Sequence, residues 1–243
     1  LCAVTLSALA WNGAAFAQPF VAPAQAAAAT TATMAAPAAP AAAAADPFRE
    51  RVNKSQRHLE WIPIKSGDRT LQTFVAYPEV KDKAPVIILI HEIFGMSSWV
   101  ESLSDELAEA GFIVVAPDLL SGMAPGGGRT ADFADQTGIR SAIGKLTPDG
   151  VATDLDAVFA YAKTIPSGNG KIAVAGFCWG GGHSFNYATK QKDLAAAFVF
   201  YGTPPSSDDA LKAINCPVYG FYGGMDNRVT STVDPTKERM KAA

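Results

Sequence analysis

At positions 176–180 the chain reads Gly176-Phe177-Cys178-Trp179-Gly180, between an apolar segment, 171–177, and a segment rich in small residues, 180–190. The first segment is typical of a strand and the second of a helix. In a sharp strand-to-helix turn, side chains two positions before or after the centre would crowd the neighbouring strand and helix, so glycine is favoured there. The pattern predicts a nucleophile elbow centred on Cys178. The first backbone N–H groups of the following helix would favour the thiolate form of Cys178 over the thiol.

Two other interpretations of this stretch compete with the elbow. Free cysteine is among the most buried residue types, so Cys178 could be a small apolar core residue. A dinucleotide-binding loop requires G-x-G-x-x-G, and glycines at 176, 180, 181 and 182 do not have that spacing. The choice between a catalytic and a buried thiol therefore depends on the rest of the chain.

The two ends of the 243-residue chain differ strongly in composition, because no charged residue precedes Asp46. Residues 1–17 are mostly apolar and end in Ala15-Phe16-Ala17, a small-x-small pattern typical of signal-peptidase sites, so we predict a signal peptide remnant. Residues 18–45 are rich in Ala and Pro and are typical of a disordered tether. We expect a periplasmic or secreted protein whose globular domain covers residues 46–243.

Charge and cysteine content exclude several classes of partner. The formal net charge is −3, which provides no basic surface for nucleic acid or anionic membranes, and no apolar run of the mature chain is long enough to span a bilayer. Apart from Cys2, the cysteines are Cys178 and Cys216, too few for a disulfide framework. Cys216 precedes Pro217 at a predicted strand, so we expect it to be buried. The sequence does not predict an oligomeric state.

The globular part alternates predicted strands and helices. The aliphatic run 86–90 is typical of a strand covered by helices on both faces, and strands 59–64 and 70–77, joined by a turn at Gly67, predict an antiparallel edge. The order predicts an α/β fold with a doubly wound, mostly parallel sheet. The further strands expected are 112–116, 171–177, 195–201 and 217–222, and the helices are 97–110, 131–146, 149–165 and 180–190, with a weak helix between the last two strands.

A glycine-rich segment, 121–128, follows the predicted strand 112–116. Loops at the ends of such strands are where α/β folds place binding sites. The segment lacks the G-K-S/T ending of a phosphate-binding loop, so that alternative is disfavoured.

A cysteine hydrolase also needs an acid and a histidine, which follow the nucleophile in that order in α/β-hydrolases. Asp226 stands after the strand 217–222 and a Gly-Gly turn, where the acid is expected, although turns favour aspartate in any case. The chain's histidines, His58, His91 and His183, all precede Asp226. We therefore expect the catalytic histidine beyond residue 243, and a sequence that ends before the last strand and helix of its fold.

None of the three histidines has a pattern that favours it as the base. His183 comes five positions after Cys178 on a predicted helix, which turns it about 140° away from the nucleophile. His58 has no supporting motif. His91 ends the strand 86–90, next to a more informative residue.

Three motifs occur together in this order: His91-Glu92-Ile93-Phe94-Gly95, Gly176-Phe177-Cys178-Trp179-Gly180-Gly181 and Tyr222-Gly223-Gly224-Met225-Asp226. Together they resemble the dienelactone hydrolase family from about residue 59 onward. The resemblance implies an α/β-hydrolase fold. It also implies that Glu92 contacts the resting thiol and accepts its proton, in agreement with the raised pKa of a carboxylate near a buried site. By the same resemblance the N–H groups of Ile93 and Trp179 form the oxyanion hole.

Family members that cleave dienelactone bind its carboxylate with arginines. Arg129 and Arg140 are candidates between the glycine-rich segment and the elbow, but no motif anchors either of them. The export signal also departs from a cytosolic enzyme of aromatic degradation, so the resemblance does not identify the substrate.

We predict a hydrolase that cleaves a small ester or lactone through a thioester on Cys178, with Asp226 as the orienting acid and no cofactor or metal. Two alternatives remain open: a non-catalytic binding protein with the same fold, and a thiol redox or sensor protein. The second is disfavoured because the chain has no C-x-x-C. A chain that ends at residue 243 is expected to expose a sheet edge and apolar surface.

Overall fold

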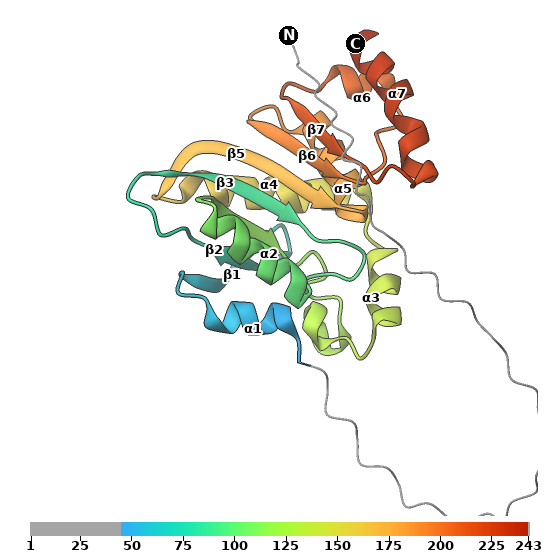
Figure 1. The fold of residues 1–243 in the computed structure, drawn as a ribbon. Coiled ribbons are helices and arrows are strands. Elements are labelled where there is room, and N and C mark those ends of the chain that lie inside the picture. The colour runs from blue at the N-terminus through green and yellow to red at the C-terminus, as the bar shows by residue number, and fades with distance from the viewer. Residues whose placement is uncertain (1–44, 243) are drawn as a thin grey trace, which may run out of the picture.

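The computed structural model describes residues 45–242. The predicted signal peptide remnant and tether lie outside these residues, except for residue 45. The described residues form one sheet in the order β1-β2-β4-β3-β5-β6-β7 (Figure 1). Its strands are β1 (Leu59–Ser66), β2 (Arg69–Ala76), β3 (Ala84–Ile90), β4 (Ile113–Pro117), β5 (Gly168–Phe177), β6 (Ala196–Phe200) and β7 (Val218–Phe221).

The sheet has the predicted direction of strands. β1 and β4 each pair antiparallel with β2, while the pairs among β4, β3, β5, β6 and β7 are all parallel. The predicted antiparallel edge and mostly parallel sheet are therefore confirmed. Parallel strands that run side by side end at one edge of the sheet, so the loops that follow β3, β5, β6 and β7 meet there.

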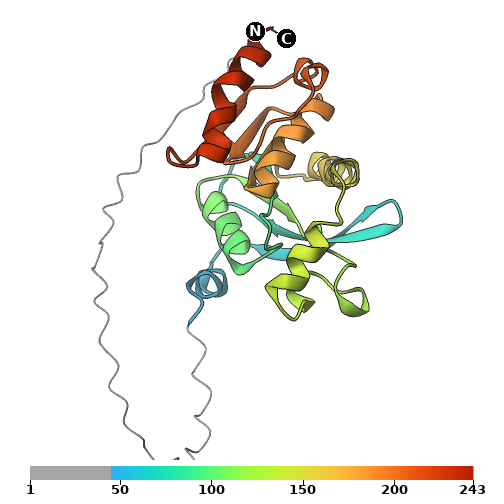
Figure 2. The ribbon, with the colours of Figure 1, turned by 90° about the vertical axis from the view of Figure 1, so that its right-hand side faces the viewer.

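Helices cover both faces of the sheet, as the aliphatic strand β3 predicts. One face carries α2 with α1 packed outside it, and the other carries α4 and α5 (Figures 1 and 2). Leu155 of α4 and Tyr187 of α5 are completely enclosed in the larger core cluster. The helices are α1 (Pro47–Lys54), α2 (Ser98–Glu109), α3 (Gln136–Ile143), α4 (Pro148–Thr164), α5 (Trp179–Lys190), α6 (Asp208–Lys212) and α7 (Asn227–Ala242).

Three local predictions are wrong or incomplete. The helix expected over 131–146 is a 3-10 turn followed by α3, because Asp135 caps the helix by accepting the N–H of Gly138 at 2.8 Å. The helix expected over 97–110 begins at Ser98, and the side chain of the preceding Ser97 makes no capping bond. No predicted element corresponds to α1.

An apolar groove of about 660 Å³ lies along β3, β5, β6 and α2. Phe177, Phe200 and Phe221 stack across three neighbouring strands, with ring centroids 4.3 and 4.6 Å apart. β7 is an edge strand of the described sheet.

Ion pairs attach α1 to α2. α1 has no fully buried residue, so charge contributes strongly to the contact. Asp105 of α2, which is fully buried, accepts two hydrogen bonds of 2.7 Å from Arg57 and lies 3.0 Å from Arg51. Burial opposes ionisation of Asp105, but the bonds from Arg57 and Ser55 and the nearby positive charges hold its pKa below the usual value.

We predict that Asp105→Asn lowers the free energy of unfolding at pH 7 by about 3 kcal/mol, because it leaves partly buried guanidinium groups without their carboxylate. The pKa of Asp105 is lowered in the folded state, so its stabilisation is complete above its unfolded-state pKa and is lost as the pH falls through the folded-state value. Urea unfolding of wild type and variant should therefore differ most near neutrality and converge in acid.

Glu109→Gln is the matched control, because Glu109 is bonded to Arg51 but its side chain is 61% exposed. Exposed pairs contribute about 0.2–1 kcal/mol. Equal losses in the two variants would contradict the central role of Asp105.

Candidate active site

Cys178 occupies a strained turn between β5 and α5. Its φ of 55° and ψ of −114° lie in a region that non-glycine residues rarely adopt, and its N–H donates to the carbonyl of Phe200 at 2.9 Å. Such conformations persist only where the surrounding structure enforces them, and they are concentrated at functional sites. The predicted sharp turn is therefore confirmed, with Cys178 at the N-terminus of α5.

The flanking glycines are required by close contacts between backbones. A Cβ atom on Gly176 would lie 2.1 Å from the carbonyl oxygen of Gly180, and one on Gly180 would lie 2.3 Å from that of His91. Gly181 and Gly202 approach each other in the same way, since a Cβ on Gly202 would lie 2.2 Å from the carbonyl carbon of Gly181. The start of α5 thus packs directly on the ends of β3 and β6.

We predict that Gly180→Ala destabilises the protein by ~2 kcal/mol or more, because the added methyl group meets fixed backbone atoms. Gly144→Ala is the matched control: Gly144 has helical backbone angles, and its nearest atoms would be 3.6 Å from the new Cβ. That variant should be neutral or slightly stabilising. Urea unfolding of both variants tests this, and a stable Gly180→Ala protein would contradict it.

A cavity of about 320 Å³ opens at Cys178. Four segments contribute to its wall: the start of α4, the Cys178 turn with α5, the loop after β6, and α7. The wall includes Cys178, Trp179, His183, Tyr201, Thr203 and Arg228.

Glu92 stands in the turn after β3, where Gly95 donates its N–H to the Glu92 carbonyl at 3.1 Å. Burial raises the pKa of the half-buried Glu92 carboxyl, against a smaller opposing effect of Arg140. Burial also raises the pKa of Tyr201, and the charges of Cys178 and Glu92 add to this rise. Tyr201 is therefore within electrostatic range of both Cys178 and Glu92.

The two predicted oxyanion donors lie on neighbouring segments. Trp179 is the first residue of α5, and Ile93 belongs to the turn after β3, against which Gly180 packs. Within residues 45–242 neither backbone N–H has a backbone acceptor. The role of these two N–H groups as oxyanion donors stays a prediction.

His91 is fully buried, and both of its ring nitrogens have partners. Nδ1 lies 2.8 Å from the carbonyl oxygen of Glu92, and Nε2 accepts the N–H of Leu119 at 3.3 Å. The ring stacks on Trp179, with centroids 5.5 Å apart and an interplanar angle of 13°. Burial lowers the pKa of His91. His91 is therefore a neutral residue that orients its neighbours and is not available as a base.

Asp118 and Thr130 form a buried network that the sequence analysis missed. The Asp118 carboxylate accepts the N–H of Thr130 at 2.8 Å and its hydroxyl at 2.7 Å, and the same hydroxyl oxygen accepts the N–H of Met96 at 3.1 Å. This links the loop after β4 to the turn that carries Glu92. The available signal was the position of Asp118 directly after β4, where functional polar residues gather in α/β folds.

Asp226 follows β7, as predicted, and its N–H donates to the carbonyl of Gly223 at 3.0 Å. Its carboxylate lies 3.4 Å from the guanidinium of Arg228. Arg228 borders the cavity at Cys178, whereas Asp226 does not. Asp226 is therefore next to the cavity rather than in its wall.

The remaining histidines differ in position. His58 is exposed directly before β1, and its Nε2 lies 3.6 Å from a carboxylate oxygen of Glu60. His183 is half-buried, and its ring packs on Trp179 at 4.2 Å. It was expected to be turned away from Cys178, but it borders the same cavity. Burial, with a contribution from His91, lowers the pKa of His183 to about 4.

Comparison with known proteins places this architecture in a family. The sequence model of the dienelactone hydrolase family matches residues 71–243. The chain belongs to the dienelactone hydrolase family.

Its relatives include a candidate carboxymethylenebutenolidase of Salmonella typhimurium, 31% identical over 75% of this chain and 70% of the relative. Carboxymethylenebutenolidase 1 of Cupriavidus pinatubonensis is 30% identical over 70% of this chain and 72% of its own length. The crystal structure of a candidate dienelactone hydrolase from Klebsiella pneumoniae has a TM-score of 0.67 and 27% identity, and covers 78% of this chain and 82% of that one. The predicted α/β fold and hydrolase class are confirmed.

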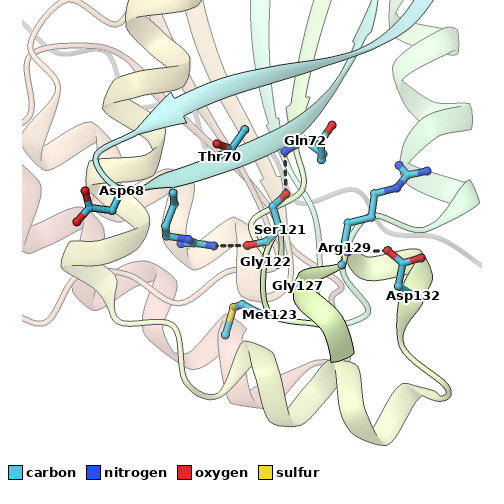
Figure 3. Close-up of a pocket in the computed structure, with 11 residues that line it drawn as sticks. Asp68, Thr70, Gln72, Ser121, Gly122, Met123, Gly127, Arg129 and Asp132 are labelled. Atoms are coloured by element: carbon cyan, nitrogen blue, oxygen red, sulfur yellow. Dashed lines mark hydrogen bonds between the residues drawn. The ribbon is translucent and has the colours of Figure 1, made fainter.

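Two of the eight arginines of this dienelactone hydrolase family member make no ion pair within the described residues, and they are Arg129 and Arg140. The Arg140 guanidinium lies 4.9 Å from the ring centroid of Phe94 and acts on Glu92. Arg129 lies over Trp61 at 3.9 Å, in a different pocket (Figure 3). Of these two arginines, only Arg140 therefore acts on Glu92.

Residues 45–242 contain neither a metal-ligand cluster nor a membrane-spanning helix. In that range no three His, Cys, Asp or Glu side chains come together as metal ligands. No helix there has both the length and the apolar character needed to cross a bilayer. Buried Cys216 is 3% exposed, in agreement with its predicted burial.

Proposed function

We propose that this hydrolase of the dienelactone hydrolase family cleaves small esters or lactones through a thioester on Cys178. The observation that carries the proposal is the strained Cys178 turn, which opens to a cavity. Cys178 and Glu92, whose carboxyl has a raised pKa, both act electrostatically on Tyr201 in the wall of that cavity. A carboxylate of raised basicity accepts a proton more readily near neutral pH. The helix N-terminus behind Cys178 further favours the thiolate.

In the proposed reaction Glu92 takes the thiol proton, and the thiolate attacks the carbonyl carbon of the substrate. The carbonyl oxygen becomes an oxyanion, which accepts hydrogen bonds from the N–H groups of Ile93 and Trp179. Collapse of this intermediate breaks the bond to the leaving oxygen, which receives a proton, and leaves an acyl group on sulfur. Attack by water on the thioester then releases the acid and restores the thiol.

A histidine would deliver the proton to the leaving oxygen and activate the water, with Asp226 as its orienting acid. We propose that this histidine lies beyond residue 243. His91 has no free nitrogen, and His183 packs on Trp179. We also propose that the protein is exported, on the pattern of residues 1–17.

We predict that Glu92→Gln lowers the rate of Cys178 alkylation by iodoacetamide at pH 7 by about tenfold or more, because the thiol loses its proton acceptor. The pH profile of alkylation should shift to higher pH. His183→Gln is the control and should leave the profile in place. A Glu92→Gln profile equal to wild type would contradict the role of Glu92, and a shift in His183→Gln alone would assign the base to His183.

Hydrolysis of p-nitrophenyl acetate by the full-length protein tests the nucleophile. Cys178→Ala should reduce kcat/KM by at least about a thousandfold, since a covalent pathway is removed. Hydrolysis that survives both this substitution and alkylation would contradict the cysteine mechanism. Normal alkylation without turnover of any ester would instead support the alternative of a non-catalytic binding protein.

The surroundings of Arg140 favour a substrate that carries a carboxylate. Its guanidinium has no carboxylate partner among the described residues and lies beside Phe94 and Glu92, and guanidinium groups bind carboxylates in bidentate geometry. We propose that it binds a carboxylate of the ester or lactone. The relatives named carboxymethylenebutenolidase are consistent with this class.

We predict that Arg140→Gln raises KM about tenfold for a p-nitrophenyl ester that carries a free carboxylate, and leaves KM for p-nitrophenyl acetate nearly unchanged. Because hydrolysis of both esters would use Glu92, the ratio of the two KM values cancels any general effect of the Arg140→Gln substitution on Glu92. Arg129→Gln is the matched control and should change neither value. An equal change for both esters would contradict carboxylate recognition by Arg140.

A further inference from the structure

A second pocket, of about 550 Å³, lies between the β1–β2 hairpin and the loop after β4 (Figure 3). It shares no lining residue with the cavity at Cys178. It contains both features of the sequence that the proposed hydrolysis leaves unused, namely the glycine-rich segment 121–128 and Arg129. Volumes of about 300–1,000 Å³ are typical of small-molecule sites.

Hydrogen bonds between the hairpin and the loop hold the wall of this pocket in place. The Ser121 hydroxyl oxygen accepts the N–H of Gln72 at 2.8 Å, and the hydroxyl donates to the carbonyl of Asp118 at 2.6 Å. Arg69 donates to the carbonyls of Leu119 and Ser121 at 2.8 and 3.1 Å (Figure 3) and pairs with a buried aspartate of α4. The pocket is therefore preformed, and Arg69 is already used in building it.

Arg129 differs from Arg69 because its guanidinium has no ion-pair partner within residues 45–242. It lies 3.9 Å from the ring centroid of Trp61, a cation–π contact that restricts its orientation. Its backbone N–H donates to the Asp132 carboxylate at 2.8 Å, which anchors the base of the side chain. A guanidinium has only hydrogen-bond donors, so the Arg129 group is suited to bind an anion with several acceptor atoms.

The carboxylates of the pocket are suited to hydrogen-bond donors on a ligand, whereas Arg129 is suited to acceptors. Asp132 lies at the same end as Arg129, Asp68 lies at the far end, and Thr70 lies between them (Figure 3). Ionised carboxylates only accept hydrogen bonds, so Asp68 and Asp132 favour hydroxyl groups on a ligand and repel a compact dianion such as phosphate. The matching ligand has a single carboxylate and several hydroxyl groups.

We propose that this pocket binds a polyhydroxylated carboxylate of the sugar-acid class. The carboxylate accepts hydrogen bonds from Arg129, and the hydroxyl groups donate to Asp132 and, in a longer ligand, to Asp68. Thr70 contributes a hydroxyl along the wall between the two ends. The site is separate from Cys178, so it does not depend on the proposed hydrolysis.

The test uses NMR titration of the full-length protein with D-glucuronate as the probe and with D-glucose and acetate as comparisons. The indole N–H signals of Trp61 and Trp179, assigned with single Trp→Phe variants, report on the two pockets separately. D-Glucuronate should shift the Trp61 signal with a dissociation constant of about a millimolar, the value that ligand efficiency gives for a molecule of this size. Glucose supplies only the hydroxyl groups and acetate only the carboxylate, so each should bind at least about tenfold more weakly than D-glucuronate.

Arg129→Gln should weaken glucuronate binding about tenfold or more, since it removes the charged donor. Arg140→Gln, which changes the other arginine without an ion pair, should leave binding at Trp61 unchanged. Both variants should keep the urea midpoint of wild type, which separates loss of binding from loss of fold. The proposal is overturned by shifts confined to Trp179, by weakening in Arg140→Gln alone, by equal binding of glucose, or by no shift at concentrations well above the expected dissociation constant.

Discussion

Direct contact between backbones at the start of α5 is the constraint on which the candidate site depends. Gly176, Gly180, Gly181 and Gly202 sit where a single added carbon would overlap a carbonyl or amide of β3, β6 or α5. Because no side chain separates these segments, the ends of β3, β5 and β6 are drawn together at one edge of the sheet. The same closeness forces Cys178 into its unusual backbone conformation and brings Trp179 beside the turn that carries Ile93 and Glu92.

Around this contact a buried polar network holds the loops in fixed positions. Asp118 accepts three hydrogen bonds, two of them from Thr130, and Thr130 in turn binds the backbone at Met96. His91 joins the same loop to Trp179, because its Nε2 accepts the N–H of Leu119 and its ring stacks on Trp179. Its Nδ1 bonds to the carbonyl of Glu92. Buried polar groups of this kind are costly unless every member is satisfied. Their saturation explains how irregular loops can present Glu92 in a reproducible place.

The two arginines without ion pairs show how tertiary structure divides similar residues between different sites. Arg129 and Arg140 are eleven positions apart, yet one lies over Trp61 and the other over Phe94. In both cases an aromatic face stabilises the cation while leaving its N–H donors open. The intervening turn and α3 direct them toward separate pockets, which sequence spacing alone does not indicate.

The sequence by itself determined the order of strands and helices, the mostly parallel sheet and the sharp turn at Cys178. These follow from local patterns: aliphatic runs such as 86–90, and glycines spaced around a cysteine, where residues adjacent in the chain carry the whole signal. It also determined the family through three short motifs. Local patterns failed at α3, where Asp135 starts the helix later than hydrophobicity suggests, and at α1, whose attachment relies on carboxylates of α2 some fifty positions away. Only the tertiary structure decided the Asp118–Thr130 network, the contact of His183 with Trp179 and the different pockets of Arg129 and Arg140. Each of these depends on distances between segments remote in the chain, and such distances are set by packing.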